Sequence, residues 1–325
     1  MGFRKYKRWM YRVGTAFLVL LVGLEVSLQA GHLLAYSLRE PHELPHENAP
    51  AILCVGDSHT YGVALPSEES YPGQLQRMLD EKGHHVNVIN DGVPGQNTSE
   101  LRRRLPDLLD EHSPEVVVIL SGFNNRWNRS EVLWSDIEDG VAESGARGAA
   151  KSLWYRLATT LRTVRLATYL WNEYRRRDDN SPIQKSWYED REGRRHYHEW
   201  RPSDDDPDIN SVMARTRRDL AAMVDMIRKA GAEPVFLTYA GKPGSPMTLA
   251  NHLIVTSARS RAVPVVDIDA VIRPLITGPD GGLDKDAHDK LFLPGEHETH
   301  LGAEGYRIVA REILEELEET GMISD

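Results

Sequence analysis

The chain has 325 residues, a formal net charge of −10 and one cysteine. Hydrophobic residues make up 40% and charged residues 27% of the sequence, proportions typical of a globular protein. The acidic balance argues against nucleic acid as a partner, and a single cysteine excludes an internal disulfide. The length suits one large domain plus a membrane anchor.

The N-terminus combines positive charge with a long apolar stretch. Residues 1–12 contain Arg4, Lys5, Lys7, Arg8 and Arg12 and no acidic residue, and mostly apolar residues follow as far as residue 36. About 20 such residues span a bilayer, and positive charge before them keeps the N-terminus in the cytoplasm. We therefore expect residues 1–36 to form a basic tail and a single-pass anchor. The rest of the chain is then extracytoplasmic, on the periplasmic side in a Gram-negative cell.

Glu25 interrupts the apolar stretch, and we expect it either near the outer interface or protonated. A cleaved signal peptide with its cut near Ala30 is the alternative, although Leu28 fits the small-residue requirement poorly. A cytosolic protein with an apolar first helix fits the basic start badly. Residues 37–50, rich in Pro, His and Glu, are expected to be a linker between the membrane and a domain spanning residues 51–325.

Residues 51–55 form the first predicted strand of that domain, and Gly56-Asp57-Ser58-His59 follow it directly. A short apolar run closed by glycine is typical of a buried strand. A serine just beyond such a strand lies where open α/β sheets carry their chemistry. Alternatively, Asp57 and Ser58 only complete a turn by bonding to local backbone. Cys54, inside the strand, is expected to be a small core residue.

Two further strands, at residues 86–89 and 116–120, end in polar loops. The first loop contains Gly95, and the second contains Asn124 followed by Asn125. Residues 68–81 between the first two strands are expected to be helical, and a helix capped by Thr98 or Ser99 runs to Leu109. If the strands are parallel, both loops open on the same sheet edge as Ser58.

Residues 126–210 are too long for a plain loop and carry six of the seven Trp residues. An apolar stripe from Leu153 to Trp171 predicts a helix, whereas residues 188–208 are too polar for a core and are expected to be flexible. Three interpretations of this Trp-rich helical insertion stay open. It is a cap whose aromatic residues pack on the core, a lid or substrate platform over Ser58, or a surface whose arginines face anionic lipid headgroups.

The alternating pattern continues to the C-terminus, with expected helices at residues 213–230, 253–260 and 303–317 and strands at 234–239 and 263–268. Alternating helices and β-branched runs predict a parallel sheet with helices on both faces. His297 and His300 stand just before the last helix. A metal site is not expected, because zinc needs three or four convergent ligands and the chain has no HExxH motif.

Four blocks in this order resemble the SGNH, or GDSL-type, hydrolase family. They are Gly56-Asp57-Ser58, Gly95, Gly122-Phe123-Asn124-Asn125 and His297-Glu298-Thr299-His300. The resemblance covers roughly residues 51–125 and 215–320. It implies the flavodoxin-like three-layer α/β/α fold, a Ser58 nucleophile and a His300 base. It also implies an oxyanion hole made by the backbone N–H groups of Ser58 and Gly95 and the side-chain amide of Asn124. No cofactor is implied.

Two positions depart from the family pattern. Where the family usually has Asp three residues before the histidine, this chain has His297, which cannot stabilise a positively charged imidazole as a carboxylate does. The carboxylate partner of His300 is then Glu296, Glu298, Asp286 or Asp289, or the enzyme operates with a Ser–His pair assisted by backbone groups. The second departure is Asn125 in place of Asp, at a position that is usually structural.

The resemblance predicts a membrane-anchored, extracytoplasmic serine esterase that acts through an acyl-enzyme. Its location suggests envelope substrates, such as O-acetyl groups on polysaccharide or a lipid ester. The same acyl-enzyme would serve an O-acyltransferase that passes the acyl group to a sugar hydroxyl. A non-catalytic envelope-binding protein of the same fold is the third hypothesis, favoured by the missing Asp at position 297.

Overall fold

The computed structural model describes residues 2–37, 45–126, 184–189, 195–200, 209–242, 247–295 and 299–323, together with 153, 160–164, 166–167, 170 and 245. The chain forms two compact units. One comprises Met1–Pro41 and Leu133–Asp179, and the other comprises His42–Val132 and Asn180–Asp325. The expected division into residues 1–36, 37–50 and 51–325 stays a prediction.

The first unit is built on the long helix α1, Gly2–Ser37. Its segment Arg12–Gly31 is long and apolar enough to cross a membrane by length and composition. Leu18, Val19 and Leu20 are among its exposed apolar side chains. Such a surface is unfavourable in water and suits a lipid environment.

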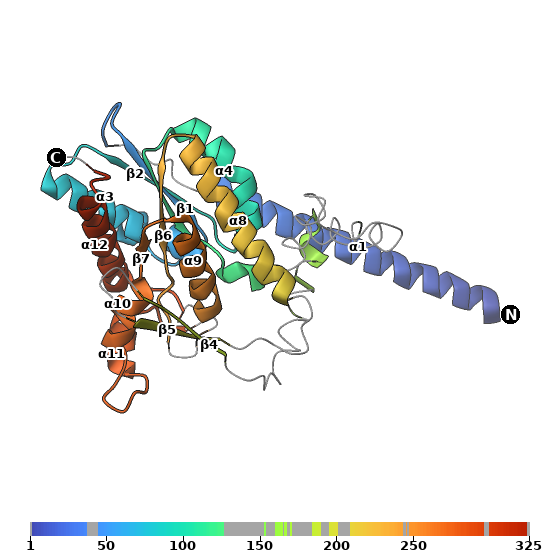
Figure 1. The fold of residues 1–325 in the computed structure, drawn as a ribbon. Coiled ribbons are helices and arrows are strands. Elements are labelled where there is room, and N and C mark those ends of the chain that lie inside the picture. The colour runs from blue at the N-terminus through green and yellow to red at the C-terminus, as the bar shows by residue number, and fades with distance from the viewer. Residues whose placement is uncertain are drawn as a thin grey trace. The chain divides into compact units, whose positions relative to one another are not determined.

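The second unit contains a five-stranded parallel sheet in the order β2-β1-β3-β6-β7 (Figure 1). Its strands are β1 (Ala51–Gly56), β2 (Asn87–Gly92), β3 (Val116–Leu120), β6 (Glu233–Leu237) and β7 (Val265–Val266). This is the flavodoxin-like strand order, and it confirms the predicted fold class. In register, Gly56 of β1 lies beside Gly92 and Leu120, so the first three strands end together.

Helices cover both faces of the sheet, which gives three layers (Figure 1). On one side α3 (Tyr71–Lys82) packs against α12 (Ala303–Glu319). On the other, α8 (Ile209–Lys229) packs against α4 (Thr98–His112) and α9 (Met247–Arg261). The short elements are α2 (Ser58–Tyr61), η1 (Ser67–Glu69), η2 (Phe123–Arg126), α10 (Ile268–Leu275) and α11 (Lys285–Leu291).

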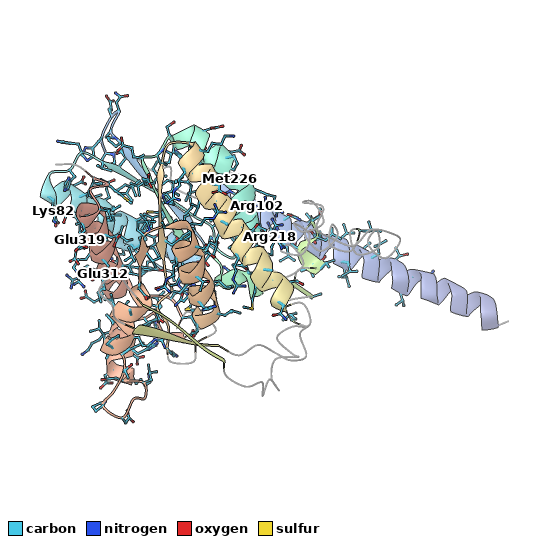
Figure 2. The ribbon with its side chains drawn as sticks, viewed as in Figure 1. Lys82, Arg102, Arg218, Met226, Glu312 and Glu319 are labelled. Atoms are coloured by element: carbon cyan, nitrogen blue, oxygen red, sulfur yellow. The ribbon has the colours of Figure 1, made fainter. Side chains whose placement is uncertain are left out.

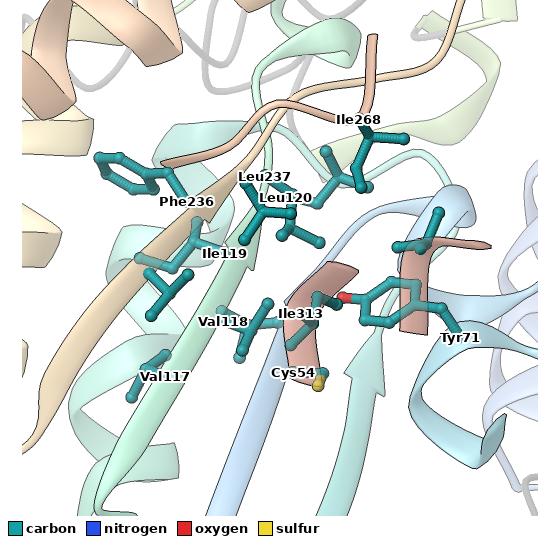
Figure 3. Close-up of a cluster of buried hydrophobic side chains, with 14 of the residues drawn as sticks. Cys54, Tyr71, Val117, Val118, Ile119, Leu120, Phe236, Leu237, Ile268 and Ile313 are labelled. Carbon is teal, nitrogen blue, oxygen red and sulfur yellow. The ribbon is translucent and has the colours of Figure 1, made fainter. Parts of the chain in front are cut away.

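The core lies between the sheet and these helices, and Figure 3 shows part of it. Val117, Val118 and Ile119 are fully buried because both faces of β3 are covered. Cys54 lies among them, and its burial raises the pKa of the thiol to about 12. A thiol that stays protonated is a poor nucleophile.

Local signals fix the helix boundaries more sharply than apolar periodicity does. Ser70 caps α3, so Glu68 and Glu69, which we expected inside this helix, form the separate turn η1. Asn97 caps α4 through a capping box with Glu100, and it takes the place predicted for Thr98 or Ser99. At the other end of α3, Lys82 lies beside α12 (Figure 2). Its Nζ contacts Glu318 Oε1 at 2.6 Å.

The structure describes parts of the insertion at residues 126–210. The predicted helix from Leu153 to Trp171 is helical at its described residues 153, 160, 162–164, 166–167 and 170. Within residues 188–208, which we expected to be flexible, and just before them, β4 (Gln184–Glu189) and β5 (Arg195–Trp200) form an antiparallel pair in which Trp187 lies opposite Tyr197. Aromatic residues have high strand propensity, and two facing strands satisfy each other's backbone groups even where the sequence is polar. Trp127, Trp134, Trp154 and Trp171 lie outside the described residues.

Candidate active site

Ser58 occupies the turn immediately after β1, at the first position of α2. The turn requires glycine at position 56, because a Cβ there would lie 2.3 Å from the Leu120 carbonyl oxygen. Asp57 caps α2 by accepting a hydrogen bond from the backbone N–H of His59 at 3.0 Å. Ser58 is thereby held, half-buried, at the carboxyl edge of the sheet.

His300 lies beside Ser58 although 242 residues separate them: Ser58 Oγ and His300 Nε2 are 2.8 Å apart. The segment that carries His300 is fixed by an antiparallel bridge between Phe292 and Leu301, and Leu293 N–H donates to the His300 carbonyl at 2.9 Å. The separation is within the hydrogen-bonding range of a nucleophile and its general base. The structure therefore brings together the two residues that the sequence predicted as nucleophile and base.

The other ring nitrogen, His300 Nδ1, lies 3.3 Å from Thr299 Oγ1. The four candidate carboxylates are placed differently. Asp289 contacts Lys285 and His288 of its own helix, and Asp286 is exposed at the start of that helix. The remaining candidates, Glu296 and Glu298, lie outside the described residues, as does His297. The carboxylate partner of His300 stays a prediction.

Gly95 lies in a tight turn after β2. Gln96 N–H donates to the Val93 carbonyl at 3.0 Å, and Gly95 has a φ of +78°. Pro94 followed by a residue with positive φ is the pattern of a type II turn, whose third position favours glycine. A Cβ at Gly95 would meet no atom within 4 Å, so φ rather than space selects the glycine. The turn alone explains this residue type, and the oxyanion role of Gly95 stays a prediction.

Asn124 follows β3 and is largely buried, with 9% of its surface exposed. Its Nδ2 donates to Asp57 Oδ2 and to the Gln96 carbonyl, both at 3.2 Å. These contacts place the amide between the serine turn and the Gly95 turn. Both amide hydrogens have an acceptor, so an oxyanion would have to replace or share one of them.

Asn125 has a different set of partners, all structural. Its Oδ1 accepts from Thr98 N–H at 2.9 Å, and its Nδ2 donates to the hydroxyl oxygens of Thr98 and Thr216 at 2.7 and 2.6 Å. It therefore joins the β3 loop to α4 and α8. The amide makes these contacts without a charge, which explains why Asn serves where related sequences often have Asp.

The Asp57 side chain has a buried partner, Tyr239, which was not among the predicted site residues. The Tyr239 hydroxyl donates to Asp57 Oδ2 at 2.7 Å, and both side chains are buried. Burial raises the pKa of the Asp57 carboxyl to about 7, although the hydrogen bonds from His59 and Tyr239 oppose the shift. Tyr239 follows β6, so its place at the carboxyl edge of a predicted strand was the available signal.

His59, next to the serine, stacks on His300. The two ring centroids are 4.2 Å apart and the planes differ by 13°. Tyr239 and Phe123 meet the His59 ring edge to face at 5.1 and 6.0 Å. Burial, and then the nearby His300, lower the pKa of His59 well below its usual value, so this imidazole is neutral. His59 is therefore a flat, uncharged surface behind the His300 ring.

Within the described parts of the chain, no three His, Cys, Asp or Glu side chains gather closely enough to hold a metal ion. His297, one of the histidines weighed above as a metal ligand, lies outside those parts.

Residues 54–308 match the model of the GDSL-like lipase/acylhydrolase family, and the chain belongs to that family. The match confirms the resemblance found in the four blocks. An arylesterase of Vibrio mimicus is 42% identical over 74 residues, which is 23% of this chain and 37% of the relative. Esterase TesA of Pseudomonas aeruginosa is 34% identical over 77 residues, 24% of this chain and 38% of the relative. The chain thus spans about two fifths of the length of these curated relatives.

Two solved structures are similar to the chain at lower identity. A crystal structure of TesA is 16% identical with a TM-score of 0.44, covering 82% of this chain and 97% of the other. An acetyl xylan esterase, AlAXEase, is 15% identical with a TM-score of 0.48, covering 82% and 99%.

Proposed function

We propose that the chain is a serine ester hydrolase, anchored in the membrane and acting outside the cytoplasm. The observation that carries the catalytic part is the 2.8 Å approach of Ser58 Oγ to His300 Nε2 at the carboxyl edge of the sheet. Membership of an acylhydrolase family and the local similarity to two esterases support the same activity.

In the proposed reaction, Ser58 Oγ attacks the carbonyl carbon of an ester while its proton passes to His300 Nε2. The backbone N–H groups of Ser58 and Gly95 and the Asn124 amide stabilise the oxyanion that forms. The carbon–oxygen bond to the alcohol then breaks, and His300 returns the proton to the departing oxygen. Water then attacks the acyl carbon while its proton passes to His300, the bond from that carbon to Ser58 Oγ breaks, and His300 returns the proton to Ser58 Oγ.

The missing carboxylate at position 297 does not prevent this sequence of steps. A serine enzyme that lacks the third member of its triad loses rate but keeps part of its catalytic power. Among the described residues, Thr299 Oγ1 lies 3.3 Å from His300 Nδ1 and His59 stacks on the His300 ring. We propose that these contacts orient the imidazole.

The proposed location rests on α1. Its segment Arg12–Gly31 has the length and composition of a membrane span, and a cluster of Lys and Arg precedes it. That arrangement favours an N-terminus in the cytoplasm and a catalytic domain outside. Substrates there include O-acetylated polysaccharides and lipid esters. An acceptor sugar in place of water would make the enzyme an O-acyltransferase.

The activity is tested with the full chain in detergent micelles and p-nitrophenyl acetate as substrate. Wild type should release nitrophenol with a burst equal to the amount of enzyme, and Ser58→Ala and His300→Ala should not. A sugar acceptor that increases turnover would point to transfer. Folded wild type without a burst or turnover would contradict the proposal and favour a binding protein. Fusions of alkaline phosphatase and of green fluorescent protein to the C-terminus test the location, because only an extracytoplasmic C-terminus gives phosphatase activity without fluorescence.

A further inference from the structure

A contact within the first unit joins α1 to the insertion. The Glu25 carboxylate accepts hydrogen bonds from the backbone N–H groups of Arg162 and Thr163 at 3.0 and 2.8 Å, and from the Thr163 hydroxyl at 2.9 Å. A helical turn begins at Arg162, and the first N–H groups of a helix have no partner within it. Glu25 therefore gives these N–H groups an acceptor, and they satisfy a carboxylate that interrupts an apolar helix.

Gln29, one turn further along α1, extends the contact. Its Nε2 donates to Glu25 at 2.7 Å and to the Thr160 carbonyl at 3.1 Å, while its Oε1 accepts from Arg162 Nε at 3.1 Å. Among residues 12–16 and 18–31, whose exposure the structure describes, only Glu25, Leu28 and Gln29 are half-buried. Their spacing puts them on one helix face. This docking face of α1 is where residues 160–163 contact it.

The docking face lies toward the end of the apolar segment. Six residues separate Glu25 from Gly31, about 9 Å of helix, whereas about 20 Å separates Glu25 from Arg12. In the orientation proposed above, on which this inference rests, Glu25 is near the outer headgroup region. The segment that contacts Glu25 is held at the same depth.

The part of the sequence around the segment that contacts Glu25 has the composition of a membrane-surface element. Residues 153–177 contain six Arg and one acidic residue, in a chain whose net charge is −10. Leu153, Leu166 and Leu170 are exposed. Five aromatic residues accompany them in the sequence. Exposed leucines with arginines and Trp or Tyr are the combination that binds at the boundary between anionic headgroups and acyl chains.

We propose that the described residues 160–164, 166–167 and 170 form a second membrane-contacting element, docked on the outer part of α1 through Glu25 and seated on anionic lipid. Leu166 and Leu170 enter the edge of the apolar layer, and the Arg-rich composition of this part of the sequence supplies positive charge for the headgroups. This part of the insertion thereby contacts the membrane surface.

The test uses the full chain reconstituted into vesicles, with single cysteines introduced for a fluorescent label. Cys54 is buried with a raised thiol pKa, so it should not react with the label. We compare the quenching of the label by spin-labelled lipid at three positions. They are Leu166→Cys, Leu20→Cys in α1 and the exposed Arg307→Cys of α12. We expect quenching at positions 166 and 20, none at 307, and several-fold stronger quenching at 166 in phosphatidylglycerol than in phosphatidylcholine.

The outcomes separate this inference from the proposed anchor. Quenching at position 20 without quenching at 166 would overturn the second element and leave the anchor intact. No quenching at either position would overturn both. Quenching at 166 that is equal in the two lipids would contradict the role of anionic headgroups.

Cross-linking tests the role of Glu25. A short bifunctional thiol reagent should join Gln29→Cys to Thr160→Cys efficiently and Ser27→Cys to Thr160→Cys poorly, because Ser27 is exposed outside the docking face. Glu25→Ala should lower both the first yield and the quenching at position 166 several-fold, and Glu25→Gln should lower them less. An unchanged yield and unchanged quenching in Glu25→Ala would overturn the docking.

Discussion

The imidazole rings of His59 and His300 lie nearly parallel, with centroids 4.2 Å apart. One belongs to the turn after β1 and the other to the segment before α12, so the stack ties the serine turn to the proposed base. Because His59 is buried and its lowered pKa keeps it neutral, it supports the ring of His300 without competing for the proton.

Removal of this support should impair catalysis more than binding. We expect His59→Ala to lower kcat by roughly 10- to 100-fold, because small displacements of a catalytic group cost rates of that order. His59→Phe keeps a flat ring and should stay within a few-fold of wild type. Steady-state kinetics of wild type and both variants, measured at a temperature at which each protein is folded, test this prediction. Equal losses in the Ala and Phe variants, or a change confined to KM, would contradict the role.

Asn124 and Asn125 offer a matched pair of substitutions at adjacent positions. Asn124→Ala should lower kcat by about 100- to 1000-fold, the usual effect of deleting one oxyanion donor. Asn125→Ala should leave kcat nearly unchanged and reduce the free energy of unfolding by about 1–3 kcal/mol, because it leaves buried groups of Thr98 and Thr216 without their partner. Kinetics and urea unfolding of both variants distinguish them. A larger kinetic effect at Asn125 than at Asn124 would refute the assignment.

The buried Asp57 carboxyl should make stability depend on pH. Its pKa is raised from 3.8 to about 7 in the folded protein, so folded chains retain a proton that unfolded chains lose. Its stabilising contribution is complete below pH 3.8, the pKa in the unfolded chain. It disappears as the pH rises to about 7, the pKa in the folded chain. Between them, the free energy of unfolding should fall by about 1.4 kcal/mol per pH unit relative to Asp57→Asn.

Urea unfolding of wild type and Asp57→Asn at pH 4 to 8 measures this difference. Asp267, whose pKa is also raised to about 7, is present in both proteins and cancels in the comparison. A difference that stays constant across the range would show that Asp57 titrates normally.

Tyr239→Phe tests the hydrogen bond from Tyr239 to Asp57, the carboxylate that also accepts from Asn124. The substitution removes the hydroxyl that donates to Asp57 Oδ2 at 2.7 Å, while the ring still meets His59. We expect a loss of about 1–3 kcal/mol in the free energy of unfolding. Any loss of kcat should be smaller than in Asn124→Ala, because Tyr239 acts on Asn124 indirectly, through Asp57 and through the backbone N–H of Phe123. Kinetic and unfolding measurements on both variants check these two statements. A greater loss of kcat in Tyr239→Phe than in Asn124→Ala would contradict the indirect role of Tyr239.

Apolar runs that end in polar loops predicted β1, β2 and β3, and the carboxyl ends of parallel strands share one edge. The pairing of Ser58 with His300 was implied by the resemblance to the hydrolase family, because the His300 block follows no predicted strand. The Asp57–Tyr239 and His59–His300 contacts were not predicted, because they depend on register and on rotamers of residues far apart in sequence. The start of α9 at Met247 and the helices α10 and α11 were also missed. The helices α10 and α11 begin at the local caps Asp267 and Asp284, and both helices are too short to show a clear apolar period.

The central claim is that Ser58 is a nucleophile activated by His300. The most direct measurement is intact-mass and peptide analysis of the full chain in detergent after treatment with a fluorophosphonate. We expect one adduct, on Ser58, with labelling abolished in Ser58→Ala and strongly slowed in His300→Ala. A folded wild-type protein that forms no adduct, or one that is labelled at the same rate without His300, would contradict the account.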